Sequence, residues 1–255
     1  MFSFLALALG IIGGAPSDDA AVVCITADTL PLCSGVLIGP RTVLTAGHCV
    51  NVLGPTANYF VNIGPDCAHP QARLRIDEMR THPSYTGQGK PFDFGLAKLH
   101  ADSTVTPLVL SAASIDGVVG RTIRHVGFGT SQESPMDGRG FRRTVSHPLI
   151  RVDADFAWSG DAVANTCLGD SGGPMLFDEQ VLGVVSDGPD CHSESADQRV
   201  DRGREWLDAT RAEFEPAVAP PPKRGCSVAG WPLLWLMLLW LTRRADQTDS
   251  FAYHR

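Results

Sequence analysis

Positive charge is scarce in this sequence of 255 residues, which has 21 Lys and Arg against 28 Asp and Glu and a formal net charge of −7. No broad basic surface is expected, so nucleic acid is not an expected partner. The sequence also lacks a cluster of metal ligands, a phosphate-binding loop and a nucleic-acid-binding motif. These absences predict a protein that works with no metal ion and no organic cofactor.

Long apolar runs are missing too. Residues 227–241, rich in Leu and Trp, form a run of about 15 residues. It would span roughly 22 Å as a helix, against a hydrocarbon core of about 30 Å. Residues 215–225 before it contain four prolines, which predicts a stiff extended linker. We therefore expect a linker at 215–225, an apolar anchor or sorting segment at 226–244 and a polar tail at 245–255.

The first ten residues are apolar and end in small residues at Ala8 and Gly10, as a signal-peptidase site requires. Residues 1–10 therefore predict a short signal peptide. The alternative is a first core strand, which is less favoured because no turn separates it from Ile11. Seven cysteines agree with an oxidising compartment if they pair, and one is left over.

Charged residues make up 19% of the chain, and 26 Gly and 18 Pro punctuate it. This composition is typical of a turn-rich globular protein, and the length suits one large domain or two small ones. Short apolar runs between turn residues predict an all-β fold. The expected strands are 21–25, 35–38, 43–46, 59–63, 73–76, 95–99, 123–127, 174–177 and 181–186, and one helix is expected at 202–214.

The most informative stretch is Cys167-Leu168-Gly169-Asp170-Ser171-Gly172-Gly173-Pro174. Its glycines allow positive φ and a close approach of the backbone to a ligand. A serine in such a turn can present its hydroxyl while neighbouring N–H groups point at one spot, as acyl transfer requires. The alternative, a glycine-rich surface turn, would suffice for Gly-Gly-Pro alone.

Two upstream stretches support the chemical interpretation. Leu44-Thr45-Ala46-Gly47-His48-Cys49 supplies an imidazole that can take a proton from Ser171 and return it. Phe92-Asp93-Phe94-Gly95-Leu96-Ala97-Lys98-Leu99 supplies a carboxylate that can orient this imidazole. On its own, Asp93 could equally be a turn residue at the start of a strand.

These three stretches stand in the chain order of the trypsin/chymotrypsin serine proteases, which the sequence resembles from about Ile11 to about Ala212. A fourth, Ile11-Ile12-Gly13-Gly14, is similar to that family's mature N terminus. The resemblance implies a protease domain at 11–214. Its implied fold is two antiparallel six-stranded β-barrels with the active site between them, followed by a C-terminal helix.

The resemblance also implies site residues. The catalytic residues would be His48, Asp93 and Ser171, and the N–H groups of Gly169 and Ser171 would form the oxyanion hole. Asn165 matches the base of the primary substrate pocket, where a carboxylate would select Arg or Lys. Ser186-Asp187-Gly188 matches the strand that pairs with the substrate backbone. Nearby Asp190 and Glu194 either make the rim of the pocket acidic or simply face solvent.

Disulfides Cys33–Cys49 and Cys167–Cys191 are implied by the same resemblance. Cys24 and Cys67 then remain in the folded region, and a pair between them follows by elimination only. Cys226 is the odd cysteine, beyond the linker. Gly-Cys, an apolar run and an Arg pair together resemble the C-terminal sorting tails of myxobacterial surface proteins (MYXO-CTERM), although this chain continues past the arginines.

In the family, a new N-terminal amine pairs with the carboxylate before the serine, which predicts an activating pair of Ile11 with Asp170. The sequence as a whole predicts a secreted or surface-anchored serine endopeptidase that acts on proteins or peptides through an acyl-enzyme. A monomer is expected. Two alternatives remain: a protease-like binding or adhesion module, and an esterase that uses the same chemistry.

Overall fold

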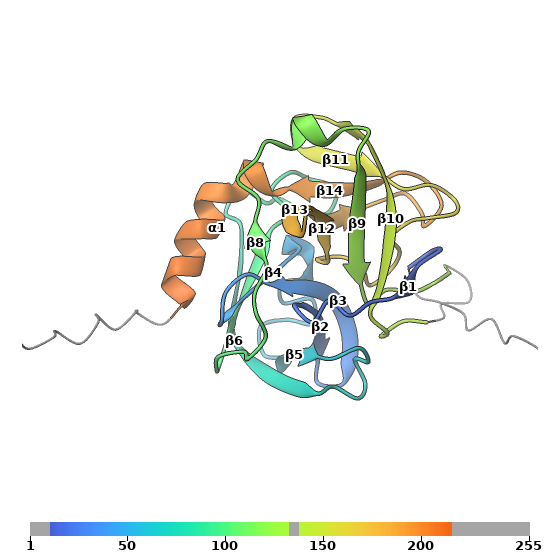
Figure 1. Cartoon of the computed structure of the whole chain (residues 1–255). Helices are drawn as coiled ribbons and strands as arrows, with labels where there is room; N and C mark the ends of the chain where they lie inside the picture. Colours follow the sequence, from blue (N-terminus) through green and yellow to red (C-terminus); the bar gives the residue numbers. More distant parts are fainter. Residues whose placement is uncertain (1–10, 133–137, 216–255) are drawn as a thin grey trace, which may run out of the picture. The chain divides into compact units, whose positions relative to one another are not determined.

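The computed structural model describes residues 11–132 and 138–215, which form two β-barrels and one C-terminal helix (Figure 1). Both barrels are antiparallel and six-stranded, as the family resemblance implied. The predicted signal peptide at 1–10, and the linker, anchor and tail from 216 onward, lie outside the described residues.

The first barrel closes in the order β2-β3-β4-β7-β6-β5, with β5 returning to pair with β2. Its interior is apolar because most strands are rich in β-branched residues and leucine, and β2 is buried along its whole length. The strands are β2 (Val22–Ala27), β3 (Leu30–Leu37), β4 (Thr42–Thr45), β5 (Tyr59–Ile63), β6 (Ala72–Thr81) and β7 (Gly95–Leu99).

The second barrel runs β10-β11-β14-β13-β12-β9 and closes through the pairing of β9 with β10. Short strands β1 (Ala15–Pro16) and β8 (Val109–Leu110) extend this sheet, and β8 is parallel to β13. The barrel strands are β9 (Thr122–Gly127), β10 (Arg143–Val152), β11 (Phe156–Ser159), β12 (Pro174–Phe177), β13 (Gln180–Asp187) and β14 (Ser195–Arg199). Two short 3₁₀ helices complete the elements, η1 (Gly47–Cys49) and η2 (Ile115–Val118).

Helix α1 (Val200–Phe214) contacts β7 of the first barrel and β13 of the second. Its buried residues recur every three or four positions, which places them on one face: Val200, Gly203, Leu207, Thr210 and Phe214. Gly203 allows a close approach, since a Cβ there would lie 2.3 Å from the ring of Phe94. The helix ends at Phe214 and is capped by Glu215, whose carboxylate accepts a hydrogen bond from Thr42 Oγ1 at 2.6 Å. The folded part therefore extends one residue into the predicted linker.

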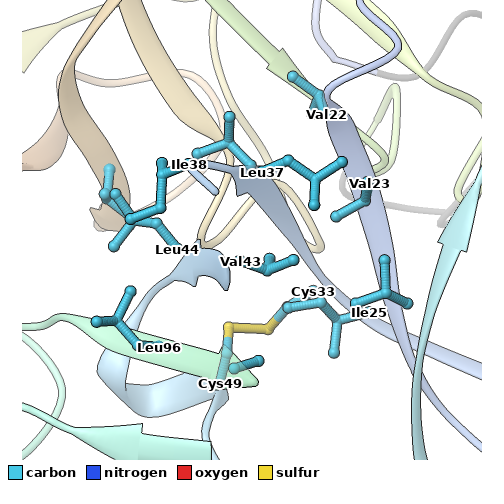
Figure 2. Packing of buried hydrophobic residues seen from close by; sticks show 14 of the residues in the cluster. Val22, Val23, Ile25, Cys33, Leu37, Ile38, Val43, Leu44, Cys49 and Leu96 are labelled. Carbon is cyan, nitrogen blue, oxygen red and sulfur yellow. A yellow bond between two sulfur atoms is a disulfide. The ribbon is translucent and has the colours of Figure 1, made fainter. Parts of the chain in front are cut away.

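The Cys33–Cys49 disulfide lies within the apolar interior of the first barrel, near Val43 and Leu96 (Figure 2). It joins β3 to the short helix η1, which carries His48. Because both cysteines are buried, the loop of His48 is anchored directly to the core.

The predicted strands 59–63, 95–99 and 174–177 match observed strands at both ends. Residues Asp178 and Glu179 form the expected tight link of β12 to β13, both with positive φ. Strands β10, β11 and β14 were not predicted. Strand β14 has the sequence Ser-Ala-Asp-Gln-Arg and is nevertheless buried along its whole length. Because it is mostly polar, it has no hydrophobic pattern from which a buried strand could be predicted.

Within the described ranges, no helix is long and apolar enough to cross a membrane.

Candidate active site

His48 and Asp93 meet where η1 faces the loop that precedes β7. Asp93 Oδ2 lies 2.8 Å from His48 Nδ1, and Asp93 Oδ1 accepts a hydrogen bond from the backbone N–H of His48 at 2.8 Å. Two bonds from one residue fix the carboxylate against the ring. The Asp93 side chain is fully buried and the His48 side chain is 20% exposed, so the ring remains accessible from the solvent side.

Two residues of the second barrel also bind Asp93. Ser186, on β13, donates from Oγ to Asp93 Oδ2 at 2.6 Å. Gln198, on β14, accepts from the Asp93 backbone N–H at 3.2 Å. The sequence analysis placed Ser186 only on the strand that pairs with substrate, and nothing in the sequence pointed to Gln198. These bonds offset the cost of burying a carboxylate.

Ser171 lies in the glycine-rich turn before β12, against both β3 and η1. Its carbonyl accepts a hydrogen bond from the Ser34 N–H at 2.9 Å, and Cys49 Sγ is 3.8 Å from the same oxygen. Gly172, next in the chain, has φ +84°, and a Cβ there would lie 2.0 Å from Thr45 Oγ1. The turn therefore requires glycine, and it brings Ser171 against the residues that flank His48.

The backbone N–H groups of Gly169 and Ser171 donate to no acceptor within the described part of the chain. The N–H of Asp170 between them instead donates to the Cys167 carbonyl at 3.0 Å. Gly169 has φ +100°, and a Cβ there would lie 3.1 Å from Gly129 Cα. The turn that carries Ser171 therefore has two backbone N–H groups without a described acceptor, and an oxyanion requires donors of this kind.

Asp170 is fully buried, and burial raises its pKa to about 7 although hydrogen bonds from the Cys167 and Gly129 N–H groups oppose this. Those bonds measure 2.9 and 2.8 Å. Ile11 is also fully buried, with φ +57°, and its N–H donates to the Thr130 carbonyl at 3.1 Å. With the bond to Gly10 intact, Ile11 has an amide in place of the amine that was predicted to pair with Asp170.

A pocket opens beside Ser171, between the serine turn, the end of β13 and the loop before β14. Its lining residues are Gln88, Thr166, Cys167, Leu168, Ser171, Val185, Ser186, Asp187, Gly188, Pro189, Asp190, Cys191 and Ser195. The predicted substrate residues Ser186, Asp187 and Gly188 are all present there. Gln88, Thr166 and Ser195 were not predicted.

Asn165, expected at the base of this pocket, is not among the described residues that line it. Its side chain is fully buried and bound to backbone groups. Nδ2 donates to the Ser193 carbonyl at 2.6 Å, and Oδ1 accepts from the Thr166 N–H at 2.9 Å. The amide is thereby held behind the pocket wall.

The acidic residues near the pocket divide into two groups. Asp187 and Asp190 line it, and neither forms an ion pair within the described residues. Asp187 accepts a 3.3 Å hydrogen bond from Gln88 Nε2, while Asp190 accepts from the N–H of His192 at 2.8 Å and from Ser193 Oγ at 3.2 Å. Glu194 instead lies 3.1 Å from Arg151 Nε and is not a lining residue.

Three disulfides form in the described part of the chain, Cys24–Cys67, Cys33–Cys49 and Cys167–Cys191. All three predicted pairs are confirmed, including the pair that rested on elimination. The Cys167–Cys191 bond joins two walls of the pocket. Cys226 lies outside the described residues.

A family model described as Trypsin matches residues 11–207, most of the chain. The chain belongs to the trypsin family. Trypsin of Saccharopolyspora erythraea is 26% identical over 207 residues, covering 71% of this chain and 88% of that protein. Human kallikrein-7 is 30% identical over 197 residues, covering 69% and 76%. This trypsin-family chain is therefore a serine endopeptidase, a hydrolase that acts on proteins or peptides.

Solved structures agree on the fold of this trypsin-family protease. Human heparin binding protein superposes with a TM-score of 0.69 at 22% identity, covering 82% of this chain and all of that one. Neuropsin from mouse brain gives a TM-score of 0.68 at 20% identity, covering 80% and 99%. At such identities, the likeness supports the two-barrel architecture and says nothing of substrates.

A second Asp–His pair lies inside the second barrel of the protease. Asp197 carboxylate oxygens are 3.0 Å from His125 Nε2, and His125 Nδ1 is 2.9 Å from His147 Nε2. Ser159 Oγ donates to Asp197 at 3.3 Å. Burial lowers the pKa of His147 to about 4, helped by the nearby His125. No pattern in the sequence predicted this cluster, because its members lie on four different strands.

Proposed function

We propose that Ser171 is the nucleophile, His48 the general base and Asp93 the residue that orients His48. The 2.8 Å contact of His48 Nδ1 with Asp93, beside the turn that carries Ser171, is the observation that best supports this assignment. Asp93 holds a proton on Nδ1, so Nε2 is free to accept the proton of the Ser171 hydroxyl.

In the proposed reaction, Ser171 Oγ attacks the substrate carbonyl carbon while His48 takes its proton. The C–N bond then breaks, the amine leaves with that proton, and an acyl-enzyme remains. A water molecule repeats the sequence, and the acid product leaves Ser171 free again. The unengaged N–H groups of Gly169 and Ser171 would stabilise the negative oxygen that develops in each half.

For substrate binding, we propose that residues 186–188 pair with the substrate backbone and that the side chain before the cleaved bond enters the pocket. Asn165 would contribute through Thr166, which it holds in the wall. Since Asn165, the residue that the family resemblance places at the pocket base, is neutral, strict dependence on Arg or Lys is not expected. Asp187 and Asp190 would give only a mild preference for cationic side chains.

Activation is proposed to follow removal of residues 1–10, which would give Ile11 a free amine. An ion pair with Asp170 would then stabilise the carboxylate, whose pKa burial raises in the intact chain. The pair would hold the backbone from Gly169 to Ser171 in its donating geometry. N-terminal sequencing of secreted, active enzyme tests this, because a fully active chain that begins elsewhere contradicts it.

Location is proposed to be the cell envelope, with residues 1–10 as a signal peptide, 11–214 as the protease domain and 215–225 as the linker. The 226–244 segment would then anchor or sort the protein, in the manner of the MYXO-CTERM tails it resembles, followed by the 245–255 tail. Deleting residues 226–255 should release active enzyme into the medium. Unchanged membrane association would rule out this segment as the anchor.

A fluorophosphonate probe tests the central assignment, because it labels only activated serines. We expect labelling of wild-type protein at Ser171 and none in Ser171→Ala. Absence of labelling in folded, N-terminally processed protein would favour a binding module. A peptide-library screen run beside simple esters then separates peptidase from esterase activity, and ester cleavage with no peptide cleavage would overturn the proposed substrate class.

A further inference from the structure

Asp93 occupies a sharp turn that the first barrel alone does not explain. Phe92, just before it, is a non-glycine residue with φ +64°, a conformation that costs free energy. The N–H of Phe94 folds back to the carbonyl of Phe92 at 2.7 Å, so the turn closes around Asp93. The Asp93 N–H is buried in this turn and needs an acceptor from outside it.

Gln198 of the second barrel supplies that acceptor. Its Oε1 receives the Asp93 N–H at 3.2 Å, and its Nε2 donates to the Asp155 carbonyl at 2.9 Å. Gln198 is fully buried. Its backbone pairs with Phe156 on one side and with Val184 on the other, so the sheet fixes the position of the Gln198 backbone.

The bonds to Asp93 divide into two kinds. His48, Ser186 and Tyr85 bind the carboxylate, and they set its rotation once the backbone is in place. Gln198 instead binds the backbone of Asp93, and it thereby fixes the position of the main chain from which the carboxylate side chain extends. Because the amide nitrogen is also bound within the second barrel, the amide oxygen is held in place and cannot follow a shift of the Asp93 turn.

We propose that Gln198 is a positioning residue that ties the Asp93 turn of the first barrel to strand β14 of the second. It thereby keeps Asp93 within hydrogen-bond distance of His48. This inference rests on the proposed triad, in which a small displacement of Asp93 would misorient the base and slow the chemical step. Substrate binding would change little, because Gln198 does not line the pocket.

Gln198→Met removes both hydrogen bonds and keeps the side-chain length. We expect kcat to fall by about 10- to 100-fold with KM within about threefold, since the loss is one of orientation. The downfield proton resonance of the His48 Nδ1–H should shift or broaden. The matched control is Gln180→Met, the same change at an exposed residue that begins β13, which should alter neither.

Gln198→Glu is a second variant that should restore the hydrogen bonds. It also allows the proposal to be tested if Gln198→Met folds poorly. A buried carboxyl has a raised pKa, and its protonated form can accept from Asp93 and donate to Asp155 as the amide does. The ionised form keeps the bond from the Asp93 N–H and loses only the bond to Asp155, so we expect kcat above that of Gln198→Met at every pH and near wild type at low pH. A kcat no higher than that of Gln198→Met in folded Gln198→Glu would contradict the proposal.

Unchanged kcat and resonance in folded Gln198→Met would also overturn it, as would equal losses in kcat and affinity without a change in the resonance. The His48 resonance can be measured without turnover. It therefore tests the positioning role of Gln198 separately from the proposed catalytic function. An inactive wild type whose resonance still depends on Gln198 would refute the proposed function and leave the positioning role supported.

Discussion

Two Asp–His pairs in this molecule have nearly the same hydrogen-bond length and very different surroundings. Asp93 contacts His48 at 2.8 Å beside Ser171, and the His48 ring is partly exposed. Asp197 contacts His125 at 3.0 Å, and both side chains are fully buried. The other nitrogen of His125 already binds His147.

The difference shows that a carboxylate–imidazole pair does not by itself make a catalytic site. A general base needs one free nitrogen within reach of a substrate proton. His48 has an exposed face for this purpose, whereas both His125 nitrogens are engaged inside the barrel. The buried pair therefore acts on stability, because each member satisfies a polar group that water cannot reach.

The largest expected difference between the two Asp–His pairs is in catalytic activity, which should depend on His48 and not on His125. We expect Ser171→Ala or His48→Ala to lower kcat by about 10⁶-fold, because the triad residues act together. His125→Gln should keep kcat within about tenfold in the folded fraction. Steady-state kinetics with casein, normalised to folded protein, give the comparison. Wild-type turnover by Ser171→Ala would refute the assignment.

For the free energy of unfolding, we expect the opposite order, with the buried Asp197–His125 pair contributing more than the Asp93–His48 pair. Asp197→Ala leaves His125 and Ser159 without their buried acceptor, and we expect a loss of about 4 kcal/mol in the free energy of unfolding. Urea titration measures it. Asp93→Ala also leaves the buried Ser186 hydroxyl without its acceptor, but His48 can turn to solvent, so this variant should lose less stability and far more activity. Equal stability losses in the two variants would remove the distinction.

Acid should weaken the buried cluster through His147. Its pKa is lowered from 6.5 to about 4, so the unfolded chain binds the proton first as the pH falls. The contribution of neutral His147 to the free energy of unfolding is fully present above about pH 6.5 and is lost as the pH falls to about 4. At 1.36 kcal/mol per pKa unit, the loss is about 3 kcal/mol.

His147→Gln is the control for this pH effect, because its amide can still donate to His125 Nδ1 and cannot take a proton. Unfolding free energies of the two proteins, measured from pH 7 to pH 4, should converge in acid. Parallel curves would show that His147 does not titrate on unfolding in this range.

Exposed charge should give the smallest effect. Asp187→Asn combined with Asp190→Asn should remove a preference of less than about tenfold for substrates with cationic side chains. The preference should also fade in about 1 M salt, where the screening length is about 3 Å. Cleavage of matched Lys and Gln peptides measures both. A strong preference that resists salt would locate the specificity elsewhere.

Local structure was predictable where neighbouring residues need a particular backbone conformation. Gly169 and Gly172 need positive φ, so the turn around Ser171 was evident from the glycines alone. The Asp178–Glu179 hairpin and strand 59–63 followed from local pattern in the same way. By contrast, the position of Asn165 depended on the Ser193 carbonyl, a partner 28 residues away, and could not be predicted from its neighbours.

The sequence by itself determined the family, the order His48, Asp93 and Ser171, and the cysteines available for pairing, because local motifs carry these features. Only the tertiary structure decided that Gln198 meets Asp93 and that His125, His147 and Asp197 form one buried cluster. These residues lie on different strands, and strand order and register bring them together. A polar residue buried among partners distant in sequence has no periodicity that reveals it.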